Sequence, residues 1–264
     1  MSVAPSSGYN TNLSKAQGLV PETLELLELW RPGMSPLELR NLVKETGALD
    51  RASDTRVTDV VSRGFAQRYL IEDGQPASWL KLLAQQGLSR QALRQLMFLY
   101  TARHNAVLYD FLTQVYWRKA TSTAGEVTKD DTRDFLERAV LCGQIQPRWS
   151  DSMMERVTRY LLGTLEDFQM IAGNRHGRRQ TTSPVIMEQT VLFLAYNLHF
   201  RSVGDGEVPS HPDWALFGLS LAQVLSLLDS AAAKGHLHIQ NAGQVIRIEW
   251  KYSDMNHVIH AITH

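Results

Sequence analysis

Apolar residues recur at helical spacing along most of the chain, and the segment 89–119 is the densest example. Its apolar positions follow the i, i+3, i+4, i+7 pattern of an amphipathic helix. The dipeptide His104-Asn105 leaves two alternatives open, a break between two helices or one long helix that passes through it. The pattern consists of Leu93, Leu96, Met97, Tyr100, Leu108, Phe111, Leu112, Val115 and Tyr116. A segment this apolar must be covered on more than one side, so we expect it to be the hub of the fold.

Helix signals also dominate the rest of the chain. Ser35, Pro36 and Glu38 combine an N-cap, a proline at the first helical position and a glutamate at the third, which is a capping box. The spacing of apolar residues predicts further helices over about 21–30, 36–46, 54–69, 77–86, 128–143, 150–168, 187–201, 220–234 and 254–262.

The pattern changes at two places, and both predict a β-hairpin. Short strands are expected on either side of a basic, glycine-bearing tip at 173–180, and residues 121–127 are expected to be a loop. Residues 236–240 and 244–252 alternate more clearly around the turn at 241–243. Each hairpin follows a helix, which is the order of a winged helix. We therefore predict a mainly α fold: a helical bundle with helix-turn-helix or winged-helix modules and short β-hairpins.

Five segments follow from this arrangement. Residues 1–18 are expected to be a flexible N-terminal arm, because serine, glycine and asparagine are frequent there. Residues 19–72 form an N-terminal helical module, either helix-turn-helix-like or part of a bundle, and 73–149 form the central helical hub. Residues 150–201 are a winged-helix-like module with the basic hairpin, and 202–264 are a C-terminal helix-hairpin-helix module.

Composition sets limits on function. The 264 residues contain 27 Lys and Arg against 27 Asp and Glu, so the net charge is zero. No bulk field attracts nucleic acid, and binding to it would need a local basic patch. The start of the chain has no apolar signal-peptide core. The longest apolar run, near 191–196, is far shorter than the about 20 residues of a spanning helix. We expect a cytoplasmic protein without membrane contact.

Candidate chemistry is sparse. The single cysteine, Cys142, excludes an intramolecular disulfide, and we interpret it as a buried structural thiol near a helix end. The pairs His236/His238 and His257/His260 lack nearby cysteine or glutamate and are interpreted as polar surface rather than a zinc site. The sequence contains no P-loop, GxGxxG, GxSxG or HExxH motif. We predict no metal, no cofactor and no enzymatic activity.

The basic tip is the strongest candidate for nucleic-acid contact. Three arginines and a histidine on a turn with two glycines are expected to project into solvent. Guanidinium groups bind phosphate oxygens in bidentate fashion, although a solvated surface loop is the alternative. A weaker basic cluster lies in the N-terminal helices, where interleaved acidic residues favour a salt-bridged helical face. The tip residues are Asn174, Arg175, His176, Arg178, Arg179 and Gln180, and the weaker cluster is Arg40, Lys44, Arg56, Arg63 and Arg68.

Four stretches carry a resemblance to a known family. They are YTARHNAVLYDFLTQVYWRK (100–119), TKDDTRDFLE (128–137), HPDWALFGLSLAQVLSLL (211–228) and GHLHIQNAGQVIRIEWKYSDMNHVI (235–259). With these, the chain resembles the BrxA family of the bacteriophage exclusion (BREX) defence systems, from about residue 19 onward. The resemblance rests on diffuse apolar and aromatic positions rather than on a catalytic signature. It implies a small, mostly helical protein of helix-turn-helix or winged-helix character with some likeness to NusB-type RNA-binding domains.

The resemblance also implies a function. Double-stranded DNA and other BREX components, including a methyltransferase and an ATPase, would be the partners. Our first hypothesis is a non-enzymatic DNA-binding accessory protein that contacts mainly the phosphate backbone. One alternative is a protein–protein adaptor that assembles the defence complex without touching nucleic acid. The other is an RNA-binding, NusB-like protein, which rests on likeness of fold alone.

Overall fold

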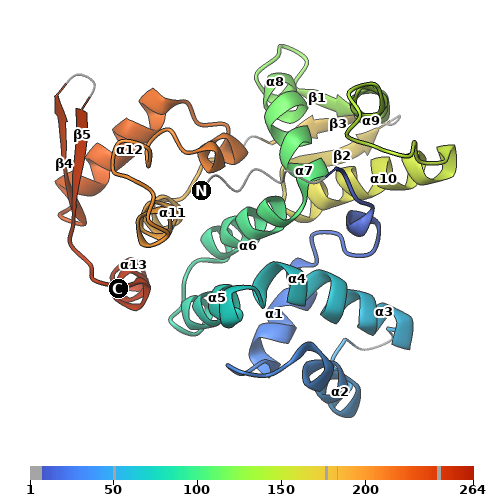
Figure 1. Ribbon diagram of the computed structural model, residues 1–264, viewed down its shortest axis with the longest axis horizontal. Helices are drawn as coiled ribbons and strands as arrows, with labels where there is room; N and C mark the ends of the chain where they lie inside the picture. The colour runs from blue at the N-terminus through green and yellow to red at the C-terminus, as the bar shows by residue number, and fades with distance from the viewer. Residues whose placement is uncertain (1–7, 50–51, 176–177, 183, 243–244) are drawn as a thin grey trace. The chain divides into compact units, whose positions relative to one another are not determined.

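The computed structural model describes residues 8–49, 52–175, 178–182, 184–242 and 245–264 (Figure 1). The chain forms two compact units, and each is built from two separate stretches of sequence. The larger unit contains residues 8–78 and 100–184, and the smaller unit contains 79–99 and 185–264. Helices dominate both, which confirms the predicted mainly α class. Within the described residues, no helix is both long enough and apolar enough to cross a membrane.

The N-terminal helices of the larger unit begin and end where local signals place them. The capping box forms: the Ser35 Oγ accepts a hydrogen bond from the Glu38 N–H at 3.3 Å, and the Glu38 carboxylate accepts one from the Ser35 N–H at 2.7 Å. The helix predicted over 54–69 has a π-helical stretch in its middle. The elements are η1 (Asn12–Ser14), α1 (Val20–Leu29), α2 (Pro36–Thr46), α3 (Asp54–Thr58), η2 (Asp59–Phe65), α4 (Ala66–Tyr69) and η3 (Glu72–Gly74).

The apolar hub is a core segment, as predicted, and it is broken at Asn105. The Asn105 backbone is extended, and its side chain accepts a hydrogen bond from the Leu108 N–H at 3.0 Å. Asparagine here ends one helix and caps the next, so the alternative of one long helix is wrong. All nine apolar positions of the hub pattern are buried. The elements are α5 (Gln75–Gln85), α6 (Arg90–His104), α7 (Ala106–Phe111), η4 (Leu112–Tyr116) and α8 (Trp117–Ala120).

A three-stranded antiparallel sheet completes the larger unit, with the strand order β1-β3-β2. Figure 1 shows helices α9 and α10 beside it. Residues 126 and 127 of the expected loop belong to strand β1, because they pair with a strand more than fifty residues later. Both ends of the predicted tip also lie in strands. The elements are β1 (Glu126–Thr128), α9 (Lys129–Leu141), α10 (Asp151–Asp167), β2 (Ile171–Arg175) and β3 (Arg178–Thr181).

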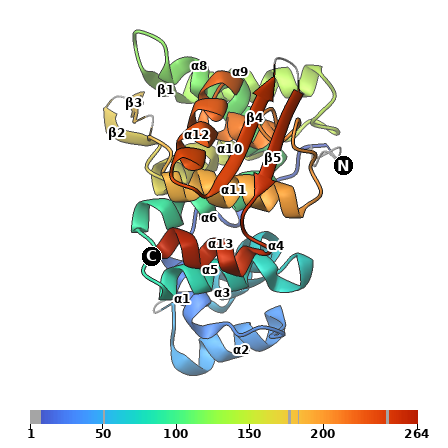
Figure 2. The ribbon, with the colours of Figure 1, turned by 90° about the vertical axis from the view of Figure 1, so that its left-hand side faces the viewer.

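The smaller unit is arranged around α11, whose residues from Thr190 to Leu198 are all buried. Helices α12 and α13 pack on α11, and the β4–β5 hairpin packs on α12 (Figure 2). Asp205 holds the hairpin: its carboxylate accepts hydrogen bonds from the Ile248 N–H and the Trp250 Nε1–H, both at 3.0 Å. The elements are α11 (Glu188–Phe200), η5 (Pro212–Phe217), α12 (Leu221–Ala233), β4 (Leu237–Ala242), β5 (Val245–Trp250) and α13 (Met255–Thr263).

Cys142 is exposed, so the interpretation of a buried structural thiol is wrong. The last buried residue of α9 is Ala139, and Cys142 forms the C-cap beyond it. Gly143 follows in a left-handed conformation with φ of 75°, which turns the chain away from the helix. A residue at a helix end can therefore look apolar in sequence and still face solvent.

Candidate nucleic-acid interface

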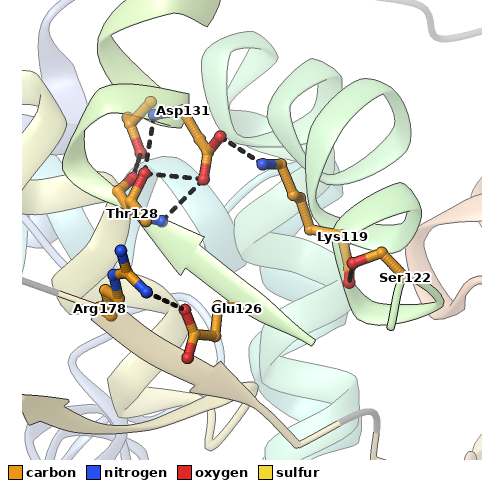
Figure 3. A network of polar contacts seen from close by, with 7 residues as sticks. Lys119, Ser122, Glu126, Thr128, Asp131 and Arg178 are labelled. Carbon is orange, nitrogen blue, oxygen red and sulfur yellow. Dashed lines mark hydrogen bonds and ion pairs between the residues drawn. The ribbon is translucent and has the colours of Figure 1, made fainter. Parts of the chain in front are cut away.

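The basic tip is held partly against the sheet. Arg178 lies on β3 with 68% of its side chain exposed, and its guanidinium is 3.7 Å from the Glu126 carboxylate on β1 (Figure 3). The Gln180 Nε2 donates to the same carboxylate at 2.8 Å. Glu126 thus draws two of the predicted contact residues toward β1. His176 and the side chains of Asn174 and Arg175 lie outside the described part of the structure.

Arg179 does not project into solvent as expected; it is 9% exposed. Successive residues of a strand point to opposite faces, so Arg178 and Gln180 share the outer face while Arg179 faces inward. It lies opposite Val127, which is fully buried. The Arg179 Nε and Nη1 atoms are buried and have no hydrogen-bond partner among the described residues. The guanidinium of Arg179 therefore faces the interior of the larger unit and cannot contact a phosphate in solvent.

A polar network fixes the strand that supports the tip (Figure 3). The Asp131 carboxylate accepts hydrogen bonds from the Thr128 N–H at 2.9 Å and the Thr128 hydroxyl at 2.8 Å, and the Lys119 ammonium lies 2.5 Å from it. Burial opposes ionisation of Asp131, but these contacts outweigh it and hold its pKa below the ordinary value. The network ties α8, β1 and the start of α9 together. It therefore also holds β3, which pairs with β1.

A second candidate contact surface lies on α10. Arg156 and Arg159 are exposed on this helix, and neither makes an ion pair with any described residue. Ser150 caps the helix by accepting a hydrogen bond from the Met153 N–H at 3.3 Å. The opposite stripe of α10 is buried in the larger unit through Met154, Val157, Leu161, Leu162 and Leu165. The outer face of the first half of α10 is thus open; it carries Arg156 and Arg159 beside Asp151 and Glu155, which lie near Arg148 and Lys129.

The second half of α10 is covered by the segment 16–18. The Asp167 carboxylate accepts a hydrogen bond from the Gly18 N–H at 3.0 Å. Arg68 fixes the same segment, because its guanidinium donates to the carbonyl oxygens of Ala16 at 2.7 Å and Gly18 at 3.3 Å. Arg68 is only 4% exposed, and burial lowers its pKa. It therefore has a structural role, and its expected role as a surface contact needs correction.

The other arginines and the lysine of the N-terminal cluster mostly lie in ion pairs, as the interleaved acidic residues favour. The N–O distances are 3.0 Å for Lys44–Asp54, 3.5 Å for Arg56–Glu22 and 3.4 Å for Arg63–Asp59. Arg40 is half-buried, and its Nε has no hydrogen-bond partner among the described atoms. Unlike Arg156 and Arg159 on α10, three of these residues have an acidic partner.

Sequence reasoning missed Arg156 and Arg159. The available signal was two arginines three residues apart on the polar stripe of the helix that precedes the basic hairpin. The signal is weak because Asp151 and Glu155 on the same helix balance the charge of the two arginines. In the structure, Glu155 lies 3.9 Å from Lys129 on α9.

The larger unit thus combines helices α7 to α8, strand β1, helices α9 and α10, and hairpin β2–β3, with β3 in the centre of the sheet. This defines a mainly helical protein with a small antiparallel sheet and a neighbouring helix, α10, that exposes two arginines. The sequence profile of the BrxA family matches residues 7–197, and the chain belongs to this family. Membership associates it with BREX defence.

Comparison with solved structures supports the same fold. A crystal structure of an uncharacterized protein from Magnetospirillum magneticum is similar over 82% of this chain and 98% of that chain, with a TM-score of 0.60. The two sequences are 17% identical, so the similarity is one of fold alone. No curated protein matches the sequence.

Proposed function

We propose that the chain is a non-enzymatic, double-stranded DNA-binding accessory protein of a BREX-type system. Family membership supports the defence role. The observation that carries the DNA-binding part is that Arg156 and Arg159, on the helix that precedes the β2–β3 hairpin, are exposed and make no ion pair with a described residue; the Arg159 guanidinium lies 5.4 Å from the Tyr160 ring centroid. The order helix, strand, helix, helix, strand, strand with β3 central supports a winged-helix assignment, in which α10 would be the recognition helix and the hairpin the wing.

In this proposal the first half of α10 enters the major groove, which is wide enough for an α-helix. Arg156 and Arg159 contact phosphates or base edges there. Ser150 caps the N-terminus of α10 and Asp151 lies in its first turn, so the two arginines rather than the helix dipole provide the positive charge. Coverage by residues 16–18 keeps the second half of the helix out of the groove.

The wing contributes through Arg178. Its pair with Glu126 is 3.7 Å long, with 68% of the Arg178 side chain and 24% of the Glu126 side chain exposed, and pairs near the surface contribute about 0–1 kcal/mol. Arg178 can therefore exchange the carboxylate for a phosphate at small cost. Arg175 and His176 remain contacts predicted from the sequence alone, and Arg179 is left out because it is buried.

Fluorescence anisotropy with a short labelled duplex tests the proposal. The double variant Arg156→Gln/Arg159→Gln should weaken binding about tenfold or more at low salt. It should also reduce the slope of log K against log salt by about 1–2, because fewer counterions are released. Arg31→Gln is the matched control: Arg31 is an exposed arginine of the same unit that lies outside the winged helix. Its affinity should equal that of the wild type.

Two results would count against DNA binding. If the wild-type protein does not bind the duplex at low salt, the proposal fails. If RNA of the same sequence displaces the duplex at lower concentration, the NusB-like, RNA-binding alternative gains the advantage. Equal loss of affinity in the Arg31 control would show that charge alone, and not α10, governs the binding.

A second candidate function is a protein adaptor, and an apolar groove in the larger unit favours it. The groove has a volume of about 430 Å³, and its lining includes Trp30, Met34 and Leu70. Two exposed hydrophobic residues, Leu37 and Ile71, are chain neighbours of lining residues. Purified BREX methyltransferase and ATPase, treated with nuclease, should then be retained by the wild type and lost with Met34→Lys. If the wild type and the Met34→Lys variant both retain the methyltransferase and the ATPase, the groove is not the binding site for these partners.

A further inference from the structure

A polar pocket of about 270 Å³ lies toward the end of α9, on the face of this helix that also carries Asp131 of the sheet-supporting network. It is formed by the helical segment of η4 and α8, by the second half of α9 and by the residues that follow α9. All of these belong to the larger unit. The lining residues are Gln114, Arg118, Phe135, Arg138, Ala139, Cys142 and Gln144.

The charge of this pocket is one-sided. Arg118 and Arg138 line it together, and no carboxylate does. Neither arginine makes an ion pair with any described residue. On α9, Glu137 pairs with Arg148 at 2.9 Å and Asp131 pairs with Lys119 at 2.5 Å, and the exposed Asp134 does not line the pocket. The pocket is therefore a cationic recess.

Helix dipoles do not account for this arrangement. Arg118 and Arg138 each lie in the last turn of a helix, where a cation is favourable. The dipole explains a positive charge at the C-terminal end of α8 and another at that of α9. It does not explain why both guanidinium groups line the same pocket, because they repel each other there. The amides of Gln114 and Gln144 add hydrogen-bond donors to the same recess. Two guanidinium groups and two amides around an open volume match an anion with several oxygens.

We propose that this pocket binds a phosphate group, held by Arg118 and Arg138. The volume of 270 Å³ lies below the roughly 300–1,000 Å³ of pockets that enclose drug-sized ligands. It therefore suits a small anion, such as pyrophosphate or the terminal phosphates of a nucleotide, better than a whole nucleotide. A duplex phosphate is the second source of the same chemistry, and the experiment separates the two.

Isothermal titration calorimetry with pyrophosphate at low ionic strength tests the full-length protein. Arg118→Gln/Arg138→Gln should weaken binding about tenfold or more, because charge-assisted hydrogen bonds are lost. Gln114→Glu is a second test that leaves both arginines in place. Gln114 is exposed, so the change should not disturb the fold, and its carboxylate should repel the anion. Arg133→Gln is the matched control: Arg133 is an exposed arginine of α9 that does not line the pocket.

The outcomes are distinct. Binding by the wild type and the control, with loss in both pocket variants, supports the proposal for a free phosphate ligand. Anisotropy with the labelled duplex is the second arm. If pyrophosphate does not bind but the pocket variants lose duplex affinity while Arg133→Gln does not, the duplex is the phosphate source. If neither ligand responds to the pocket variants, the proposal is wrong. Because the first arm contains no DNA, its result is independent of the proposed DNA-binding function.

Discussion

Arg179 offers the sharpest test of how the basic hairpin is built. The change Arg179→Met keeps most of the apolar length of the side chain and removes the guanidinium. In the structure the Nε and Nη1 atoms are buried without a hydrogen-bond partner among the described residues. A buried polar group without a partner costs about 1–3 kcal/mol. Two such donors disappear, and the loss of guanidinium packing offsets part of the gain.

We therefore expect Arg179→Met to raise the free energy of unfolding by about 1–3 kcal/mol. Urea denaturation followed by circular dichroism measures this directly. Thermal unfolding should shift upward by about 2–4 °C for each kcal/mol. Arg178→Met is the matched control on the same strand. Its side chain is 68% exposed, so the free energy of unfolding should change by less than about 0.5 kcal/mol.

The same pair of variants separates structure from DNA contact. Arg178→Met should weaken duplex binding, whereas Arg179→Met should leave it unchanged, because a buried guanidinium cannot reach a phosphate. A drop of more than about 1 kcal/mol in the stability of Arg179→Met would show that the guanidinium has a partner, and would refute the reasoning. Loss of duplex affinity in Arg179→Met at unchanged stability would refute it as well.

Three further predictions concern side chains that hold the fold. Asp205→Ala removes the acceptor of two hydrogen bonds from β5 and should lower the free energy of unfolding by about 1–3 kcal/mol in urea denaturation. An unchanged urea midpoint would contradict the role of Asp205 in holding the hairpin. Arg68→Met should cost about 2–4 kcal/mol and speed amide hydrogen exchange at Gly18, because the segment over α10 loses its donors; unchanged exchange would contradict this. Burial, with the charge of Arg68, lowers the pKa of His104 below its ordinary value of 6.5. The neutral form is favoured in the folded state, so its contribution to stability is present above about pH 6.5 and is lost as pH falls through the lowered pKa. His104→Gln should therefore flatten the loss of stability below pH 6.5, and parallel stability–pH curves for both proteins would contradict the assignment.

Local signals in the sequence determined the helices of this protein. The Ser35 capping box and the proline beside it act within one turn, so the start of α2 could be predicted from neighbours alone. Asn105 marks the break in the hub by the same kind of local hydrogen bond, but the competing possibility of a continuous helix could be removed only by the structure. The apolar stripes also fixed which helix faces are buried, because burial follows a period of 3.6 residues.

Tertiary pairing decided the candidate sites. Strand β1 is too short to show a period and exists because it pairs with β3, and that pairing turned Arg179 inward. Arg68 has a structural role because its guanidinium donates hydrogen bonds to carbonyl oxygens of the segment 16–18, some fifty residues earlier in the chain. Arg156 and Arg159 stayed exposed because that segment covers only the second half of α10. Sequence defines what each residue can do within a turn or two, whereas contacts between distant segments determine which charged groups are left for solvent.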